Sequence, residues 1–186
     1  MEEKIQLKQH NEVKKIVQEL QWNYEVQIKQ GEIYIGKIKA VKACKIIFTS
    51  LTLVGIILSI FIDASMLRIF TSVFAVVPLM LSILDNTFSN YKLNSISYKD
   101  ALNIECLKEE AISILFDITY NLENQDIIQK KMEKLITSRN ELYNSINIPS
   151  KRAEKLALKN IKRNIDNEDE EDALIPQELR EIRVKA

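Results

Sequence analysis

The stretch IIFTSLTLVGIILSIFIDASMLRIFTSVFAVVPLMLSIL, residues 46–84, decides the fold of this chain. Its two apolar runs, Ile46–Ile62 and Ile69–Leu84, hold 17 and 16 residues without a charge, and six residues, Asp63–Arg68, separate them. At about 1.5 Å per residue each run is roughly 25 Å long as a helix, slightly shorter than a bilayer core of about 30 Å, and flanking residues supply the difference. Two such runs around a short charged turn predict a transmembrane helical hairpin.

Two other interpretations of the apolar runs carry less weight. A signal peptide would lie at the N-terminus, whereas the first run follows 45 residues that include a long charged segment. A soluble domain with one very apolar hairpin at its centre is the second alternative. We therefore expect an all-α membrane protein, in which a transmembrane helical hairpin is joined to long cytosolic amphipathic helices.

The composition outside the hairpin also favours helix, because the 186 residues include only three Gly and three Pro. The pattern predicts four regions: a cytosolic helical arm (1–42), the hairpin (43–88, with spans at about 43–62 and 67–88), a cytosolic helical region (89–148), and a charged C-terminal helix with a flexible tail (149–186).

The distribution of basic residues predicts the orientation of the hairpin. Four lysines precede the first span, whereas the turn between the spans has one basic residue, Arg68. Basic residues favour the cytoplasmic side, so both termini are expected in the cytoplasm and the protein in the inner membrane. The two cysteines are then expected to be reduced thiols. The four lysines are Lys37, Lys39, Lys42 and Lys45.

Two apolar stripes indicate amphipathic helices on either side of the hairpin. The first lies in the arm, at Val13, Ile16, Val17, Leu20 and Tyr24. The second repeats at intervals of three and four, and must be buried against another helix or another subunit. We take it as a candidate assembly stripe: Ile104, Leu107, Ala111, Ile114, Leu115, Ile118 and Leu122. Gly31 and Gly36 predict a bend between the arm and the membrane.

The helix boundaries after the hairpin follow from helix-breaking and capping residues. No Gly or Pro occurs in the polar stretch Asn86–Lys92 that follows Asp85, so the second span is expected to continue as a helix into the cytosol. Asn121–Asn124 breaks the apolar pattern, and Asp126 is the expected N-cap of the next helix. Arg139 interrupts the stripe of that helix. It could pair across a helical interface, although a surface arginine with its head group in water is the better interpretation.

A charged C-terminal region follows Pro149, which cannot continue the preceding helix. Ser150 can cap a short basic helix over 151–165. The acidic run DNEDEED (Asp166–Asp172) follows it. The acidic run resembles a calcium loop only superficially, because its sixth position is Glu171 where such a loop needs glycine.

The sequence contains no catalytic or cofactor-binding pattern. His10 is the only histidine and stands alone on a polar arm, so neither a catalytic triad nor a zinc site is supported. A phosphate-binding loop is excluded for want of glycines. The basic helix lacks interleaved aromatic residues, which argues against binding to nucleic acid. We expect no enzyme activity, no metal and no cofactor.

Each predicted span has one face of small or hydroxyl-bearing residues. Small residues let helices approach closely, and hydroxyls can bond across the contact or to the backbone. These faces either pack the hairpin or, in an oligomer, line a water-filled path. They comprise Thr49, Thr52, Gly55 and Ser59 in the first span, and Thr71, Ala75, Pro78 and Ser82 in the second.

Further polar features of the hairpin bear on passage of ions. Pro78 removes a backbone hydrogen bond and is expected to kink the second helix. Asp63 and Arg68 are candidate residues of the outer mouth of a path, and Asp85 of its inner mouth. No charge lies at the middle of either span, which argues against a dedicated proton or substrate relay.

Three features occur in this order along the chain: a charged arm with Trp22-Asn23-Tyr24, the hairpin that ends in Leu84-Asp85, and the helices that begin around Tyr98–Ala111. In these features the chain resembles the SLATT family of small bacterial two-transmembrane proteins. The resemblance covers roughly residues 10–150. It implies a membrane effector of a nucleotide-second-messenger or related antiphage conflict system, silent until a partner sensor, or a nucleotide made by a partner enzyme encoded nearby, triggers it. The resemblance transfers no active-site residues.

The sequence is therefore consistent with two functions. The first is an inner-membrane effector that forms a homo-oligomer through its cytosolic helices and perforates or depolarises the bilayer. The alternative is a non-conducting anchor that holds a helical scaffold at the membrane and recruits a partner through its charged C-terminal segments.

Overall fold

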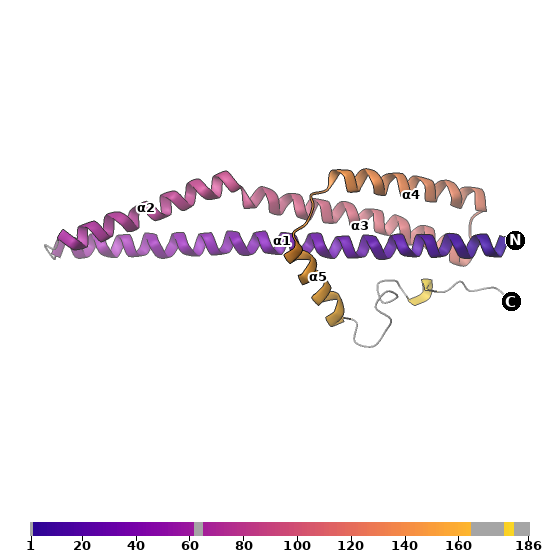
Figure 1. The fold of residues 1–186 in the computed structure, drawn as a ribbon, viewed down its shortest axis with the longest axis horizontal. Helices are drawn as coiled ribbons and strands as arrows, with labels where there is room; N and C mark the ends of the chain where they lie inside the picture. The colour runs from indigo at the N-terminus through magenta and orange to yellow at the C-terminus, as the bar shows by residue number, and fades with distance from the viewer. Residues whose placement is uncertain (1, 62–64, 165–176, 181–186) are drawn as a thin grey trace. The chain divides into compact units, whose positions relative to one another are not determined.

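The computed structural model describes residues 2–61, 65–164 and 177–180 (Figure 1). Within these residues every regular element is helical, which confirms the all-α class. The elements in chain order are α1 (Glu2–Phe61), α2 (Ser65–Phe88), α3 (Asn90–Tyr120), α4 (Gln125–Ser145), α5 (Lys151–Asn164) and the short 3₁₀ helix η2 (Gln177–Leu179). The chain forms two compact units: Met1–Gln30 with Ile96–Ala186, and Gly31–Ser95.

Helix α1 runs without a break through both glycines of the arm. The helix has no boundary at Gly31 or Gly36, because both residues lie inside the single helix Glu2–Phe61, and the bend expected there stays a prediction. One glycine in a helix costs only about 1 kcal/mol relative to alanine, and a long uninterrupted helix absorbs that cost. The division between the two units nevertheless falls at Gln30 and Gly31.

The first unit has a hydrophobic core built from three helices. The arm contributes Val13, Val17 and Leu20 from α1, and all three side chains are fully buried. The stripe of α3 packs in the same cluster, together with three residues of α4 and one of η2. The α3 and later members are Ile104, Leu107, Ala111, Ile114, Leu115, Ile118, Ile128, Met132, Leu135 and Leu179.

This packing corrects the interpretation of the α3 stripe as an assembly surface. Six of its seven residues are buried inside one chain, so their burial needs no second copy. The seventh, Leu122, lies beyond the end of α3 and is 59% exposed. An amphipathic stripe must be covered, but the sequence pattern does not say whether the cover comes from the same chain.

A constant register joins α1 to the segment from α4 to the start of α5. Five side-chain hydrogen bonds connect residues that are 120 positions apart: Gln9–Gln129, Glu19–Arg139, Asn23–Tyr143, Gln27–Asn147 and Gln30–Ser150. A constant difference in residue number means that the two segments run parallel. Helix α3 runs antiparallel to α1, because Gln6 contacts Ile118 whereas Gln21 contacts Lys108.

A break at Ser89 separates α2 from α3. The expectation of one continuous helix beyond Asp85 is therefore wrong. Ser89 has a φ of 36°, in the left-handed region that non-glycine residues rarely adopt, and its carbonyl accepts the hydrogen bond from Leu93 N at 3.1 Å that begins α3. Serine competes for backbone hydrogen bonds more readily than most residues do, so a helix can end there without Gly or Pro.

The α3–α4 connection is stabilised by a backbone motif around Asn121, which confirms the break predicted at Asn121–Asn124. Asn121 has a φ of 51°, its N–H bonds the carbonyl of Ile118, and the N–H of Leu122 bonds the carbonyl of Asp117. Paired 5→2 and 6→1 bonds of this kind form a Schellman cap, in which asparagine tolerates the left-handed position. The predicted N-cap of α4 is wrong by two residues: Asn124 precedes the helix, and Asp126 lies in its first turn.

The start of α5 follows the prediction. Ser150 Oγ accepts a hydrogen bond from Ala153 N at 3.3 Å, as an N-cap serine does. The same hydroxyl donates to Gln30 Oε1 at 2.7 Å, and this contact joins the cap to α1. Ala153 and Ala157 are fully buried, whereas Leu156 and Leu158 are exposed. The acidic run that follows α5 lies outside the described residues.

Candidate functional site

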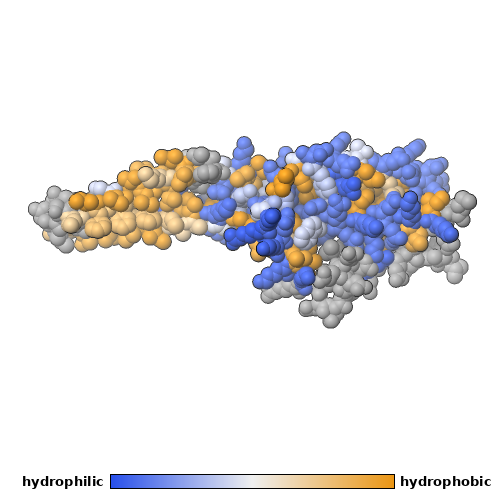
Figure 2. Space-filling model, viewed as in Figure 1, coloured by the Kyte–Doolittle hydropathy of each residue, from blue (hydrophilic) through white to orange (hydrophobic). Residues whose placement is uncertain are grey.

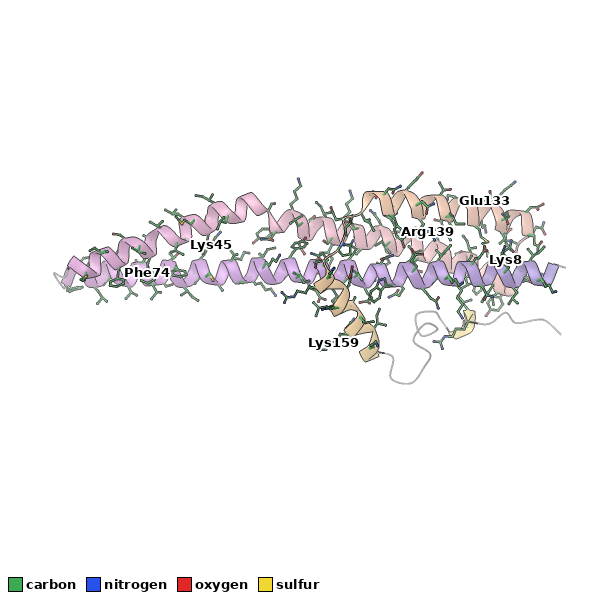
Figure 3. The ribbon with its side chains drawn as sticks, viewed as in Figure 1. Lys8, Lys45, Phe74, Glu133, Arg139 and Lys159 are labelled. Atoms are coloured by element: carbon green, nitrogen blue, oxygen red, sulfur yellow. The ribbon has the colours of Figure 1, made fainter. Side chains whose placement is uncertain are left out.

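The two apolar segments of the second unit pack closely at Gly55. A Cβ atom added at Gly55 would lie 2.5 Å from Thr71 Oγ1 and 3.3 Å from Thr71 Cγ2. The glycine therefore lets α2 approach α1 within a distance that no other residue permits. The rings of Phe48 and Phe74 also meet, with centroids 5.8 Å apart (Phe74 is labelled in Figure 3). Small residues commonly allow this approach in membrane helices.

The hydroxyl groups of the predicted faces bond to their own helices. Thr52 Oγ1 donates to the carbonyl of Phe48 at 2.9 Å, and Ser59 Oγ donates to the carbonyl of Ile56 at 2.7 Å. In α2, Ser82 Oγ donates to the carbonyl of Pro78 at 2.9 Å. Each hydroxyl thus has a partner without water, which suits a site surrounded by hydrocarbon.

The structure divides the eight predicted face residues into two groups. Thr49 and Ala75 are exposed. The other six are half-buried, and this group includes both members of the Gly55–Thr71 contact. The group comprises Thr52, Gly55, Ser59, Thr71, Pro78 and Ser82. Pro78 lies within α2, which continues past it as one helix.

The outer surface of this pair of helices is apolar. Figure 2 shows it as a continuous orange area over α2 and the C-terminal part of α1. Large apolar side chains are exposed from Ile46 to Leu84, and the exposed fraction reaches 75% at Ile60 and 80% at Phe61. Monomeric soluble proteins rarely expose contiguous apolar area of this extent, so the surface is fitted to lipid.

A comparison with protein families identifies the chain. The family model of the SMODS and SLOG-associating 2TM effector domain family 4 (SLATT_4) matches residues 10–172. The chain belongs to this family. The family description names an effector domain with two transmembrane segments and gives no catalytic activity. Searches of the curated proteins and of the solved structures each find no match.

The two segments of this SLATT protein differ in length. Among the described residues, α1 is the one helix that is long and apolar enough to cross a membrane, with a mean hydropathy of 2.2 in its most apolar window. The apolar part of α2, Ile69–Leu84, belongs to a shorter class. Such a segment can still span a bilayer if flanking residues reach the interfaces or the bilayer thins locally.

The predicted mouth residues of the SLATT hairpin fall where the structure describes little. Asp63 lies outside the described residues, and so do the side chains of Arg68 and Asp85, although both belong to α2. Their role in a path stays a prediction. No group of three or more His, Cys, Asp or Glu that could hold a metal ion occurs in the described part of the chain.

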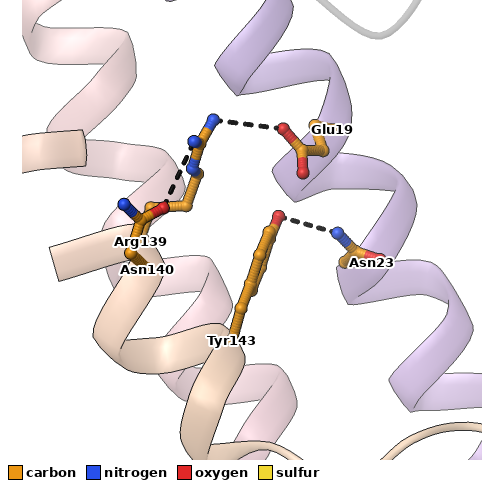
Figure 4. Close-up of polar contacts among 5 residues, drawn as sticks. All are labelled: Glu19, Asn23, Arg139, Asn140 and Tyr143. Carbon is orange, nitrogen blue, oxygen red and sulfur yellow. Dashed lines mark hydrogen bonds and ion pairs between the residues drawn. The ribbon is translucent and has the colours of Figure 1, made fainter. Parts of the chain in front are cut away.

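Between α1 and α4 the structure shows two polar contacts, one of which is the pairing of Arg139 that the sequence left open (Figure 4). Arg139 Nη1 lies 3.4 Å from Glu19 Oε2, so the arginine pairs across a helical interface, and its interpretation as a surface residue is wrong. Asn23 Nδ2 donates to Tyr143 Oη at 2.7 Å. Burial is the main cause that raises the pKa of Tyr143 to about 12, which keeps the phenol neutral at cellular pH.

His10 is also unlike its sequence interpretation, because its side chain is 1% exposed instead of lying on a polar surface. Its Nε2 lies 3.0 Å from the carbonyl oxygen of Leu179 in η2. Burial lowers the pKa of His10 below its ordinary value of 6.5, and the hydrogen bond to Leu179 opposes that effect. The tautomer that donates to Leu179 joins the arm to the described part of the C-terminal segment.

The lowered pKa of His10 predicts a pH dependence of stability. The unfolded chain takes up a proton at this histidine as the pH falls below about 6.5, whereas the folded chain resists protonation until a lower pH. The free energy of unfolding should therefore fall between pH 7.5 and pH 5.5. Urea denaturation of the full chain in detergent measures this fall, and His10→Gln should make it smaller. An equal fall in both proteins would contradict the assignment.

Proposed function

We propose that this SLATT protein is the membrane effector of a bacterial antiphage system that acts by abortive infection. On receiving a signal it oligomerises and forms a pore, or otherwise depolarises the inner membrane. The exposed apolar surface of α2 and of α1 from Ile46 onward carries this proposal, because it belongs to a member of an effector family. The hairpin crosses the membrane twice, with both termini in the cytoplasm.

The structure supports a closed resting hairpin. The contact of Gly55 with Thr71 leaves no space between the helices at that level, and the described hydroxyls of Thr52, Ser59 and Ser82 bond to backbone carbonyls. A water-filled path then requires a rearrangement that turns these hydroxyls toward water. A signal achieves this by binding the open arrangement better than the closed one. A partner sensor, or a nucleotide second-messenger synthase encoded nearby, would supply the signal.

The oligomer must use a surface other than the α3 stripe. Six residues of that stripe belong to the core of a single chain, so exposing them would disrupt the main apolar cluster of the first unit. The remaining candidates are the outer apolar surface of the hairpin and the exposed face of α5. Association of membrane helices relies on packing and hydrogen bonds, and the exposed Thr49 is one hydroxyl available for it.

A non-conducting anchor is the second candidate, and the closed hairpin favours it. An anchor needs no water-filled path, so its hydroxyl groups are expected to bond within their own helices, as they do here. The basic residues of α5, among them Lys151, Arg152 and Lys159, would then recruit a partner. These three side chains are exposed, whereas Ala153 and Ala157 on the same helix are buried.

Membrane potential distinguishes the two functions. Induced expression of the full chain in a bacterial host, with and without the sensor or synthase encoded next to it, should collapse the signal of a potential-sensitive dye within minutes when the system is triggered. Arrest of growth at an unchanged potential would support the anchor. A soluble fluorescent protein expressed at the same level controls for the burden of expression.

Removing hydroxyls tests whether they line the path. The double variant Thr52→Val/Ser59→Ala should lower triggered conductance severalfold, because an open path would lose two polar groups while the closed helices keep their shape. Single-channel or vesicle-leak recordings measure the conductance, and membrane fractionation checks insertion. Ser50→Ala is the matched control, because Ser50 is an exposed hydroxyl of the same span that is assigned neither to the path nor to assembly. Unchanged leakage in the double variant counts against the lining role of both hydroxyls.

A further inference from the structure

The second unit contains a cavity that the proposed function does not use. Its volume is about 410 Å³, within the range of about 300–1,000 Å³ that is usual for ligand pockets. All its lining residues belong to Gly31–Ser95, so the cavity lies within one compact unit. Figure 1 shows α2 diverging from α1 toward its C-terminal end, where the cavity lies. The lining residues that matter here are Tyr34, Lys37, Val41, Leu81, Leu84 and Asn90.

The α1 wall of the cavity changes from apolar to polar along the helix, and the opposite wall adds one polar side chain. On α1, Val41 lies nearest the apolar run, and Lys37 and Tyr34 follow with increasing distance from it. On the other wall, Leu81 and Leu84 belong to the apolar part of α2, and α3 contributes the polar Asn90 and the apolar Leu93. A ligand that fills this cavity must therefore have an apolar part and a polar part.

The charge around the polar end of the cavity determines which charge the ligand should carry. Glu32 lies two residues before Tyr34, and residues 33–62 contain no acidic residue, whereas Lys37 lines the cavity and Lys42 and Lys45 follow on α1 (Lys45 is labelled in Figure 3). Lys92 adds a further positive charge at the start of α3, and Asp85 is the nearest acidic residue in the sequence of α2. The balance near the cavity is positive, which favours an anion.

Aromatic rings hold two of these lysines in place. Lys37 Nζ lies 5.4 Å from the centroid of the Tyr34 ring, and Lys42 Nζ lies 5.4 Å from that of Tyr91. Contacts of this length between a cation and an aromatic face are attractive. Tyrosine and lysine are the side chains that gather where membrane helices meet the headgroups of lipids. The cavity thus has the composition of a membrane interface.

We propose that this cavity binds one anionic phospholipid of the cytoplasmic leaflet. The phosphate lies beside Lys37, and the upper part of an acyl chain lies against Val41, Leu81 and Leu84. The cavity is too small for a whole lipid with two chains, so the remainder of the chains rests on exposed side chains of α2 such as Met80 and Ile83. Neutralising the phosphate and covering apolar surface both favour the complex.

The lipid site rests on the proposed insertion of the hairpin into a membrane, but it does not require that the protein conducts ions. Lipid binding can be measured on the purified full chain in detergent, where no potential exists. A failure to bind therefore leaves the proposed function standing, and a failure to depolarise cells leaves the lipid site standing.

The experiment compares three probes by thermal unfolding of the detergent-solubilised full chain. Short-chain phosphatidylglycerol should raise the midpoint and saturate. Short-chain phosphatidylcholine, which has the same apolar part without net charge, should bind at least about fivefold more weakly, the effect expected of one basic residue near an anionic lipid. Glycerol 3-phosphate, the anion without chains, should not raise the midpoint. Equal binding of the two lipids, or binding of glycerol 3-phosphate as tight as that of the lipid, would overturn the proposal.

Two lysine variants locate the site. Lys37→Gln should weaken binding of phosphatidylglycerol about fivefold. Lys39→Gln is the matched control, because residues two apart point to different sides of a helix and Lys39 does not line the cavity. Equal losses in both variants would indicate a diffuse positive surface and overturn the assigned site. Leu84→Gln, which leaves every lysine in place, should also weaken the binding of phosphatidylglycerol. An unchanged affinity would contradict the placement of the acyl chain.

Discussion

Gly55→Ala and Gly36→Ala are expected to change stability in opposite directions, although both substitutions lie in α1. A Cβ at position 55 would meet Thr71 Oγ1 at 2.5 Å, so the Thr71 side chain or the helices must shift, and overpacking of this kind typically costs about 1–3 kcal/mol. A Cβ at position 36 meets nothing within 4 Å, so the gain in helix propensity of about 0.5–1 kcal/mol remains. Thermal unfolding of the full chain in detergent measures both.

A second substitution shows whether the loss at position 55 comes from the contact with Thr71. Thr71→Ala removes Oγ1 and Cγ2, and the nearest remaining atom, Thr71 Cβ, would lie 3.4 Å from the added Cβ. The double variant Gly55→Ala/Thr71→Ala should therefore recover most of what Gly55→Ala loses. This recovery is a coupling energy of the kind that double-mutant cycles measure between residues in contact. Independent, additive losses would mean that α1 and α2 do not pack at this point in detergent.

A larger side chain at position 55 also tests the proposed function. If the described arrangement is the closed state, weakening the Gly55–Thr71 contact lowers the energy needed to leave it. Gly55→Leu should then raise the leak of untriggered cells, provided that membrane fractions hold the variant at the level of the original chain. A variant that inserts normally and stays silent would argue that opening does not separate these helices.

The sequence pattern predicted those features that depend on one helix and its apolar period. The stripe from Ile104 to Ile118 is buried, the break at Asn121–Asn124 is present, and Ser150 caps α5. Each of these follows from spacing or from a side chain that bonds its own backbone. Which partner covers the stripe was not predictable in this way, because α1 and α4 contact it from positions far away in the sequence.

The polar contacts of α1 show why other features were missed. Gln9, Asn23, Gln27 and Gln30 occupy the same three- and four-residue spacing as the apolar stripe, yet a search for apolar residues passes over them. All four bond to residues 120 positions later in the sequence, on α4 and on the segment that follows it. Continuing the heptad spacing through polar residues was the available signal. Ser89 offered no such signal, because its left-handed backbone depends on the packing of the helices around it.

Leu115→Ala is expected to have the largest effect on the first unit. Leu115 is fully buried in the cluster shared by α1, α3 and α4, and truncating a buried leucine costs about 2–5 kcal/mol. Leu102→Ala makes the same chemical change on the same helix at a side chain that is 60% exposed, so its effect should stay within about 0.5 kcal/mol. Urea denaturation of the full chain in detergent, followed by circular dichroism, measures both variants.

The dependence of this loss on protein concentration separates a core from an assembly surface. If Leu115 packs inside one chain, the unfolding midpoints of the original protein and of Leu115→Ala should both be independent of concentration, and the difference between them should persist at high dilution. If a second copy covered the stripe, dilution would lower the midpoint of the original protein toward that of the variant, because dissociation would already have exposed Leu115. The fully buried state of Leu115 within a single chain favours the first result, and a midpoint that falls on dilution would restore the stripe as an assembly surface.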